Sequence, residues 1–189
     1  MIEKFFNIQV LKSLGHTPTQ SQTQTIYKLL SFLNDSEKFC IYALTGYAGT
    51  GKTSLISALI NVLTEMKIKT VLLAPTGRAA KVLSNYSGQS ATTIHKCIYR
   101  KKSTKKADSG FSINFNIHKD TIFIVDEASM IGNIDTGNSF FGSGRLLDDL
   151  LNFVFNDNNC RLILLGDIAQ LPPIGTNLSP ALDKGYLSS

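Results

Sequence analysis

The stretch that decides the fold runs from Phe39 to Met66, FCIYALT-GYAGTGKT-SLISALINVLTEM. Its first part, Phe39–Thr45, is almost continuously apolar and predicts a buried strand. Its last part, Thr53–Met66, places apolar residues at helical spacing and predicts an amphipathic helix. Between the two, residues 46–53 match the pattern G-x-x-x-x-G-K-S/T. This motif requires a strand before it and a helix after it, and the sequence predicts both.

The glycine-rich loop predicts a nucleotide site. Its glycines let backbone N–H groups and the start of the next helix point at a phosphate. The candidate nucleotide-binding residues are Gly46, Tyr47, Ala48, Gly49, Thr50, Gly51, Lys52, Thr53 and Ser54. Lys52 would bridge the β- and γ-phosphates, and the Thr53 hydroxyl would ligate Mg²⁺. ATP and Mg²⁺ are the predicted cofactors, and the alternative is a glycine-rich turn without a ligand.

Strands and helices alternate along the rest of the chain. Three further apolar runs predict strands at Thr70–Ala74, Thr121–Val125 and Arg161–Leu165. Helical stripes of apolar residues are found in Thr19–Leu33 and from about Ser143 to Val154, and Arg78–Ser84 is typical of a short helix. Strands that are apolar throughout and joined by amphipathic helices indicate an α/β domain, a parallel sheet with helices on both faces.

Residues 98–117 interrupt this alternation. Two short β-like runs flank a polar centre that ends in the turn signal Asp108-Ser109-Gly110, which predicts an inserted β-hairpin or small subdomain. Five basic residues crowd this insertion: Arg100, Lys101, Lys102, Lys105 and Lys106. The rest of the chain has as many acidic as basic residues, so the net charge of +5 is a local patch. A second irregular segment, Gly132–Gly144, is rich in glycine and serine, and we expect a mobile loop there.

Composition limits the class of protein. A chain of 189 residues with 43% apolar and 17% charged residues fits one globular domain and is too apolar to be disordered. No apolar run approaches the roughly 18 residues of a membrane span, and the N-terminus is a poor signal peptide. Cys40, Cys97 and Cys160 are too far apart for a disulfide framework or a zinc site. We therefore expect a cytoplasmic protein without a membrane partner.

Polar residues at two other strand ends complete the candidate site. Asp126 directly follows a predicted strand and would hold Mg²⁺, while the adjacent Glu127 would orient and deprotonate a water. A neighbouring glutamate favours hydrolysis over phosphate transfer to a hydroxyl. Gln170, after the last strand, could hydrogen-bond the γ-phosphate. The alternatives are that Asp126 and Glu127 open a helix, and that Asp167 or Gln170 is a cap or turn residue.

Five strings of the sequence resemble the ordered motifs of superfamily 1 DNA helicases, in the 5′-to-3′ branch that includes RecD and Dda. They are GYAGTGKT (46–53), APTGRAAKVL (74–83), TIHK (93–96), VDEASM (125–130) and GDIAQLPPIG (166–175). The resemblance covers roughly residues 19–175. It implies a P-loop NTPase of the RecA-like type, the first of two motor domains, with single-stranded DNA across its top. The implied division is an N-terminal lead at 1–18, the motor domain at 19–97 and 118–189, and the hairpin at 98–117.

The resemblance also implies roles for single residues. Lys52, Glu127 and Gln170 keep the catalytic roles given above. Gln22 would read adenine, although Thr19 and Gln22 are equally spaced as a helix capping box. The implied DNA-binding residues are Thr76, Arg78, Thr93 and His95, together with Arg100, Lys101, Lys102, Lys105 and Lys106 of the hairpin. The alternatives are a solvated helix position for Arg78, a structural histidine at 95, and a solvated basic loop.

The sequence departs from the family by ending at SPALDKGYLSS, shortly after the last motif. The second RecA-like domain, with the arginine that would reach the γ-phosphate, is not in it, so we expect the chain to bind ATP but turn it over poorly. The leading hypothesis is the ATP-binding motor domain of an ATP-dependent DNA helicase or translocase, with nuclease or recombination subunits as further partners. The alternatives are another P-loop ATPase, such as a clamp-loader-like switch or a kinase, and a nucleotide-gated DNA-binding module without turnover.

Overall fold

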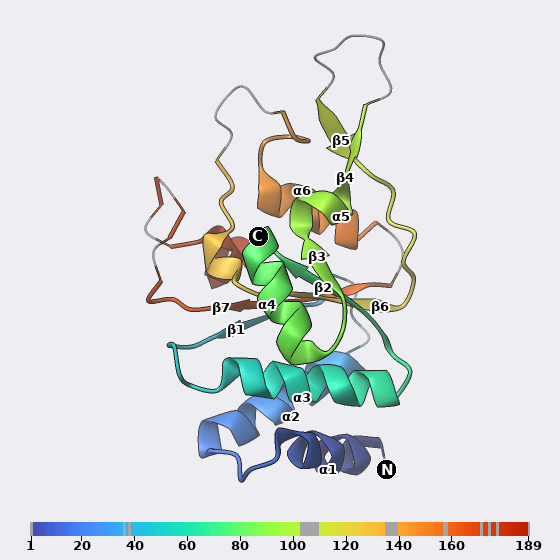
Figure 1. Cartoon of the computed structure of the whole chain (residues 1–189), viewed down its shortest axis with the longest axis vertical. Coiled ribbons are helices and arrows are strands. Elements are labelled where there is room, and N and C mark those ends of the chain that lie inside the picture. The colour runs from blue at the N-terminus through green and yellow to red at the C-terminus, as the bar shows by residue number, and fades with distance from the viewer. Residues whose placement is uncertain are drawn as a thin grey trace.

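The computed structural model of the chain describes residues 2–35, 37, 39–102, 110–134, 140–156, 159–170, 172–173, 175–176 and 178–188. A five-stranded sheet lies at its centre (Figure 1). Its strands are β1 (Ile41–Thr45), β2 (Lys69–Ala74), β3 (Ala91–Thr93), β6 (Thr121–Val125) and β7 (Arg161–Gly166). They are all parallel and follow the order β1-β7-β6-β2-β3. The predicted parallel sheet is confirmed, and the three-residue strand β3 at its edge is an addition.

Four helices cover one face of the sheet. They are α1 (Ile2–Leu14), α2 (Gln20–Asn34), α3 (Lys52–Glu65) and α4 (Gly77–Ser87). Their apolar sides pack in one cluster with alternate residues of the strands, among them Ile122 and Ile124 of β6. In Figure 1, α1, α2 and α3 are stacked on this side of the sheet.

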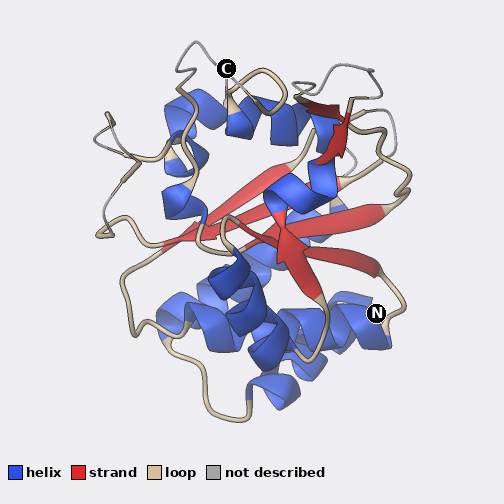
Figure 2. Ribbon diagram, turned by 45° about the horizontal axis from the view of Figure 1, so that its top comes forward, coloured by secondary structure: helices blue, strands red, loops and turns tan. Residues whose placement is uncertain are grey.

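Shorter elements cover the other face. They are α5 (Ile94–Ile98), the 3-10 turn η1 (Ala128–Met130), α6 (Leu146–Val154), the 3-10 turn η2 (Pro180–Leu182) and α7 (Lys184–Leu187). Phe123 and Val125 of β6 point into this second cluster. Figure 2 shows the strands between the two groups of helices. Because every residue of β6 is buried, on one face or the other, its sequence is apolar from Ile122 to Val125.

The predicted inserted hairpin is present. Strand β4 (Tyr99–Lys101) pairs with β5 (Phe111–Ile113) in an antiparallel ladder, in which Tyr99 faces Ile113. Helix α5 runs up to Ile98, so the paired part of the insertion begins one residue later than predicted. Lys105 and Lys106 lie outside the described residues.

The segment expected to be a mobile loop is held at its C-terminal end, residues 140–144. The backbone N–H of Phe111 donates to the carbonyl of Phe140 at 2.7 Å, and the rings of Phe111 and Phe141 stack at 4.7 Å. Gly142 has φ +50°, and a Cβ there would collide with Asp149 and Tyr99. Residues 140–144 therefore pack against the base of the hairpin, and residues 135–139 of the expected loop lie outside the described residues.

The N-terminal lead, to which the sequence analysis assigned no element, contains a helix of the core. Phe6, Val10 and Leu14 of α1 are buried and belong to the same cluster as α2 and α3. Among the described residues, no helix is long and apolar enough to cross a membrane.

Candidate nucleotide-binding site

The carboxyl edge of the sheet gathers the predicted site residues. Strands β1, β7 and β6 are neighbours, and each is followed at this edge by one of the predicted motifs. A pocket of about 480 Å³ lies there. It is lined by Ala48, Gly49, Gly51, Lys52, Thr53, Ser54, Ile56, Val82, Tyr86, Asp126, Glu127, Leu165, Gly166, Asp167 and Gln170. Four segments that are distant in sequence thus share one pocket with polar side chains directed into it.

The glycine-rich loop needs glycine at its last turn. Gly51 stands directly before α3 with φ +82°, a conformation that other residues rarely adopt. A Cβ at this position would lie 2.5 Å from Nε2 of Gln22. The loop therefore leads straight into α3, whose first N–H groups and dipole favour an anion in the pocket.

Lys52 is held within the loop. Its Nζ donates to the carbonyl oxygens of Gly46 at 2.5 Å and of Tyr47 at 2.8 Å. The Thr50 hydroxyl donates to the same Tyr47 carbonyl at 2.8 Å. The ammonium group thus lies where the loop curls around the space for a phosphate. Thr53, the next residue, is exposed on the pocket wall.

Asp126 has a fixed carboxylate. Its Oδ1 accepts a hydrogen bond from the backbone N–H of Glu127 at 2.9 Å, and its Oδ2 accepts one from the Tyr86 hydroxyl at 2.7 Å. Burial, and then the negative charge of Asp126, raise the pKa of Tyr86 well above its usual range, so the phenol remains the donor. Sequence reasoning missed Tyr86. Its four-residue spacing from Val82, which also lines the pocket, was the only local signal.

Glu127 has a strained backbone and a perturbed carboxyl. Its φ of 56° and ψ of 37° are left-handed, and its side chain makes no capping hydrogen bond to η1. Burial and the neighbouring charge of Asp126 raise its pKa, while a hydrogen bond from Gln170 and the charge of Lys52 oppose the rise. Asp126 and Glu127 do precede the short η1 turn, with Glu127 at its N-cap position, but the Glu127 side chain does not cap the turn and both residues line the pocket.

Gln170 and Asp167 follow β7 and make different side-chain contacts. The Ser129 hydroxyl donates to Oε1 of Gln170 at 3.0 Å, so the glutamine side chain is held from the η1 turn. Oδ1 of Asp167 accepts from the backbone N–H of Ala169 at 2.9 Å, which is a turn contact. Both residues lie in the turn after β7, where the N–H of Gln170 donates to the Asp167 carbonyl at 3.2 Å, and both also line the pocket. Ser129, a second residue that sequence reasoning missed, is 2% exposed.

Gln22 closes a capping box at the start of α2. The N–H of Thr19 donates to Oε1 of Gln22 at 3.0 Å, and the N–H of Gln22 donates to Oγ1 of Thr19 at 3.2 Å. Nε2 of Gln22 also donates to the Thr50 carbonyl at 3.4 Å. Gln22 and Tyr47 line a smaller cavity of about 140 Å³ beside the phosphate loop. The capping box is present, and the separate hydrogen bond from Gln22 to Thr50 joins α2 to the loop.

The two predicted DNA-contacting threonines cap helices. Oγ1 of Thr76 accepts from the N–H of Ala79 at the start of α4, and Oγ1 of Thr93 accepts from the N–H of Lys96 at the start of α5. Strands β2 and β3 are neighbours in which Ala74 faces Thr93, so both caps lie at the carboxyl edge of the sheet. This edge also carries the nucleotide pocket.

His95 is packed among aromatic rings. Its ring centroid lies 5.1 Å from that of Phe141 and 5.6 Å from that of Tyr99. Burial lowers the pKa of His95. These contacts match the structural-histidine alternative.

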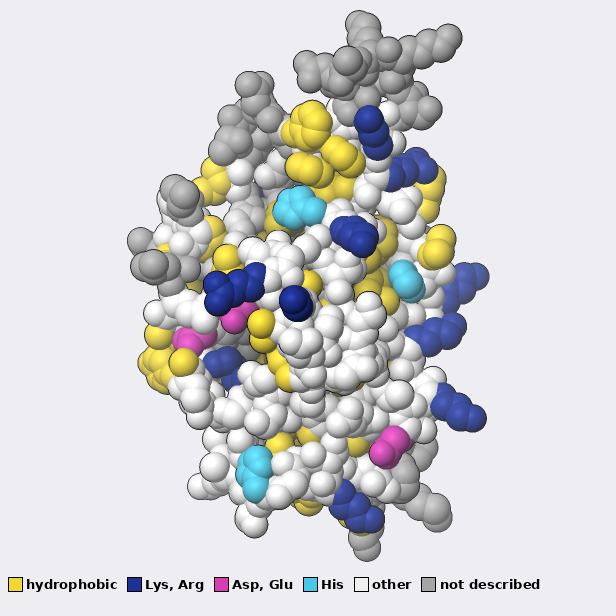
Figure 3. Space-filling model, viewed as in Figure 1, with side chains coloured by type: hydrophobic (Ala, Val, Ile, Leu, Met, Phe, Trp, Pro, Cys, Tyr) yellow, Lys and Arg dark blue, Asp and Glu magenta, His cyan; other side chains and the backbone are white. Residues whose placement is uncertain are grey.

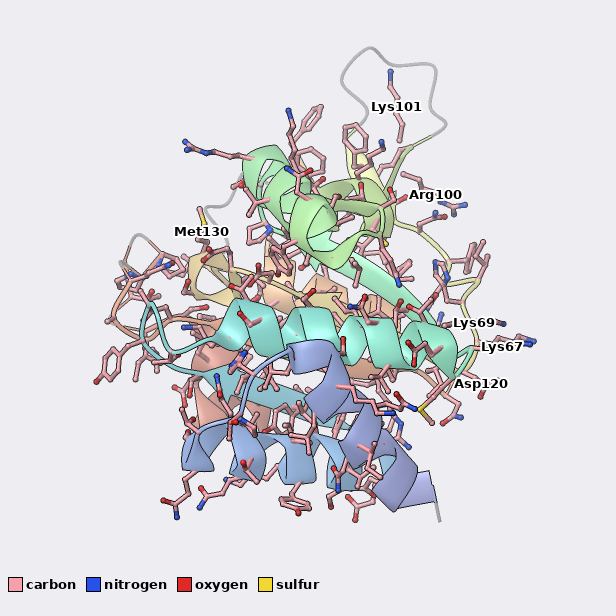
Figure 4. All side chains as sticks on the ribbon, turned by 60° about the horizontal axis from the view of Figure 1, so that its bottom comes forward. Lys67, Lys69, Arg100, Lys101, Asp120 and Met130 are labelled. Atoms are coloured by element: carbon pink, nitrogen blue, oxygen red, sulfur yellow. The ribbon has the colours of Figure 1, made fainter. Side chains whose placement is uncertain are left out.

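Of the arginines and lysines predicted to contact DNA, those that the structure describes are exposed: Arg78, Arg100, Lys101 and Lys102. The guanidinium of Arg100 lies 5.0 Å from the ring centre of Phe115. Figure 3 shows hydrophobic and basic side chains together near the base of the hairpin. In Figure 4, Arg100 and Lys101 lie on the opposite side of the molecule from Met130. Met130 is the last residue of η1, the turn that directly follows the pocket residue Glu127.

The donor chemistry of the pocket suits a magnesium–nucleotide complex. Among the described residues there is no group of three or more His, Cys, Asp or Glu side chains that could hold a metal. The pocket instead offers the hydroxyl of Thr53 and the carboxylate of Asp126. Mg²⁺ is commonly held by one or two protein oxygens together with phosphates and waters, so this small donor set fits.

The comparisons with known proteins agree with this geometry. A family model described as an AAA domain matches residues 19–179. The chain is 31% identical over 142 residues to the ATP-dependent RecD2 DNA helicase of Deinococcus radiodurans, a match that covers 73% of this chain and 17% of that protein. It is 30% identical over 148 residues to the ATP-dependent DNA helicase dda of Enterobacteria phage T4, covering 77% of this chain and 30% of that protein. The chain therefore spans less than a third of the length of these two relatives.

A solved structure supports the fold. The crystal structure of the Pif1 helicase from Candida albicans matches with a TM-score of 0.51 and 22% sequence identity, over 84% of this chain and 34% of that chain. At that identity the likeness concerns the fold alone. Together with the family match and the ordered motifs, it shows that the chain belongs to the AAA domain family as a RecA-like domain of the RecD and Dda type of superfamily 1 helicases.

Proposed function

We propose that this chain is the ATP-binding motor domain of an ATP-dependent DNA helicase or translocase. The proposal rests mainly on one observation. The phosphate loop with Lys52 lines the same pocket as the side chains of Asp126, Glu127 and Gln170. Phosphate binding alone would require only the loop. A carboxylate for the metal, a second carboxylate with a raised pKa and an amide beside it are the additional groups that ATP hydrolysis requires.

Each residue has a defined task in the proposed reaction. The loop and Lys52 bind the phosphates of ATP, while Thr53 and Asp126 hold the Mg²⁺ that neutralises their charge. Glu127 orients a water and accepts its proton, and Gln170 contacts the γ-phosphate. Gln22 and Tyr47, at the smaller cavity beside the loop, are candidates for contact with the base.

Single-stranded DNA is the proposed polymer substrate. Thr76 and Thr93, at the ends of neighbouring strands, together with the exposed Arg78, offer hydroxyl and guanidinium groups to a phosphate backbone. Arg100, Lys101 and Lys102 add positive charge on the hairpin. Because the relatives are several times longer than the matched segment, we propose that the motor acts with a second RecA-like domain, and that nuclease or recombination subunits are further candidate partners.

The cysteines bear on the proposed compartment. Cys40, Cys97 and Cys160 are present as thiols. Cysteines that are not joined in disulfides fit a reducing compartment, and we propose the cytoplasm.

Nucleotide binding is tested first with the 189-residue chain and a fluorescent ATP analogue in the presence of Mg²⁺. Lys52→Ala should weaken binding by at least about tenfold, since it removes a charge-assisted contact to phosphate. The matched control is Lys69→Ala, an exposed lysine at the amino end of β2 and thus at the opposite edge of the sheet (Figure 4). Equal loss in both variants, or no binding by the unmodified chain, would overturn the proposed nucleotide site.

The motor function is tested by ATP hydrolysis in the intact gene product, with and without a single-stranded oligonucleotide. Strong stimulation by the oligonucleotide is the expected result. DNA-independent turnover would instead favour a P-loop ATPase of another class. DNA affinity that changes with ATP but without any turnover would favour a nucleotide-gated binding module.

A further inference from the structure

Tyr86 is fixed from two directions at the edge of the nucleotide pocket. Its hydroxyl donates to Oδ2 of Asp126 at 2.7 Å, across 40 residues of sequence. Its backbone carbonyl accepts a 2.8 Å hydrogen bond from the Ser57 hydroxyl on α3. Tyr86 is therefore held through its hydroxyl by Asp126, which directly follows β6, and through its backbone by the helix that begins at Lys52.

The hydrogen bond leaves Asp126 with little freedom. A carboxylate offers about four acceptor positions on its two oxygens. The N–H of Glu127 occupies a position on Oδ1, and the phenol of Tyr86 occupies one on Oδ2. Both bonds together fix the plane of the carboxylate, and the remaining positions are available to a metal or its water.

We propose that Tyr86 is a positioning residue for Asp126, and that its hydroxyl sets the affinity of the pocket for Mg²⁺ in the magnesium–nucleotide complex. This inference rests on the proposed function, because it takes Asp126 as the metal carboxylate. The physical reason is preorganisation: without the phenol, one oxygen of the carboxylate loses its anchor, and metal binding must order the group. Hydrogen-bonded partners of metal ligands commonly contribute 10–100-fold in metal affinity.

The inference also connects two predicted sites. Tyr86 lies near the end of α4, whose first turn carries Thr76 as its cap and Arg78. Helix α4 therefore connects the predicted DNA-contacting residues at its start to the predicted metal carboxylate of Asp126, which its Tyr86 contacts. None of the five sequence motifs includes Tyr86, and its contact with Asp126 spans 40 residues of sequence.

The test is a Mg²⁺ titration of fluorescent ATP-analogue binding to the 189-residue chain and its variants. Tyr86→Phe keeps the ring and removes the hydroxyl. We expect it to raise the Mg²⁺ concentration at half-saturation by about tenfold, while binding of the nucleotide in EDTA stays within about twofold of the unmodified chain. Mg²⁺ and nucleotide together should raise the thermal midpoint of the unmodified chain, and they should raise that of Tyr86→Phe by less. This second measurement does not depend on turnover.

Tyr99→Phe is the matched control. The Tyr99 hydroxyl also donates to an aspartate Oδ2 at 2.7 Å, that of Asp149, outside the nucleotide pocket. It should leave the Mg²⁺ titration within about twofold of the unmodified chain even if it lowers stability. In addition, Tyr86→Phe should have no further effect in a chain that already carries Asp126→Asn, since the two residues act through one hydrogen bond.

The outcomes separate the two proposals. An unmodified chain that binds the nucleotide without any Mg²⁺ dependence would overturn both the metal site and this inference. A Mg²⁺-dependent unmodified chain with an unchanged titration in Tyr86→Phe would overturn only the inference and leave the proposed function standing. An equal shift in Tyr99→Phe would assign the effect to general loss of stability and would also overturn it.

Discussion

Ser129 and Gln170, which are 41 residues apart in sequence, are joined by a 3.0 Å hydrogen bond from Oγ of Ser129 to Oε1 of Gln170. The bond fixes which end of the amide is turned to the serine. Because Oε1 accepts from Ser129, the NH₂ end of Gln170 is the one left to donate to Glu127 or to an incoming phosphate. The η1 turn thereby orients a group on the loop after β7.

Ser129→Ala should therefore impair turnover more than binding. Without its anchor, the Gln170 side chain can rotate or flip, and misplacement of a group in an active site by about 1 Å can cost on the order of a hundredfold. We expect ATP hydrolysis by the intact gene product to fall by about ten- to a hundredfold, with nucleotide affinity within about twofold. The control is Ser179→Ala, because the buried Ser179 hydroxyl bonds the carbonyls of Ala128 and Ile131 in the same segment. A similar loss of turnover in the control would refute the specific role of Ser129.

Glu127→Gln should stop hydrolysis and leave binding intact. Removal of a general base costs about 10²–10⁴-fold in rate. Because the pKa of Glu127 is raised by burial and by Asp126, the carboxylate is protonated at a higher pH than an ordinary glutamate. The rate should thus fall with decreasing pH, starting above the usual glutamate range. A variant that hydrolysed ATP at the normal rate would show that Glu127 is not the base.

The same pKa shift predicts that the Glu127→Gln variant is more stable than the unmodified chain at neutral pH. A carboxyl group whose pKa is higher in the folded state than in the unfolded state destabilises the fold at neutral pH, where it is charged. Glu127→Gln removes that charge, so its thermal midpoint should exceed that of the unmodified chain at pH 7. The difference should shrink as the pH falls toward the unfolded value of about 4.3. Glu65→Gln, at the exposed end of α3, serves as the control and should show no comparable trend.

Much of the fold could be predicted because burial leaves a local pattern. All five residues of β6 are buried, so its sequence is an apolar run from Ile122 to Val125. Strand β3 has only three half-buried residues and left no such run. In α1 the buried residues Phe6, Val10 and Leu14 do follow a four-residue spacing, but polar residues between them hid the stripe.

The site was predictable only where its chemistry lies within a motif. Lys52 and Asp126 are marked by their neighbours in sequence, whereas Tyr86 and Ser129 act through contacts that span 40 and 41 residues. Such contacts depend on the order of strands in the sheet, which spacing along the chain does not encode. The dual role of Gln22, in a capping box and against the phosphate loop, likewise required the three-dimensional arrangement.

Asp149 should be essential for the packing at the base of the hairpin. This carboxylate is 1% exposed and accepts hydrogen bonds from the hydroxyls of Tyr99 and Ser143 and from the N–H of Ser143. Asp149→Ala would leave those donors without an acceptor, at a cost of about 2–4 kcal/mol in the free energy of unfolding. Tyr99→Phe removes one of these donors, so it should cost only about 1 kcal/mol. Urea unfolding measures both, and equal small effects would contradict the assigned role of Asp149.

Gln22 and Thr19 allow the capping and nucleotide roles to be separated. Thr19→Ala removes the side-chain acceptor at the start of α2 and should cost about 1 kcal/mol in stability. Gln22→Ala removes its half of the same capping box and, in addition, the contact to the Thr50 carbonyl and a side chain beside the smaller cavity. If Gln22 contacts the base, Gln22→Ala should weaken ATP binding severalfold and reduce the preference for ATP over GTP, whereas Thr19→Ala should change only the thermal midpoint. Identical nucleotide affinities in the two variants would restrict Gln22 to its capping role.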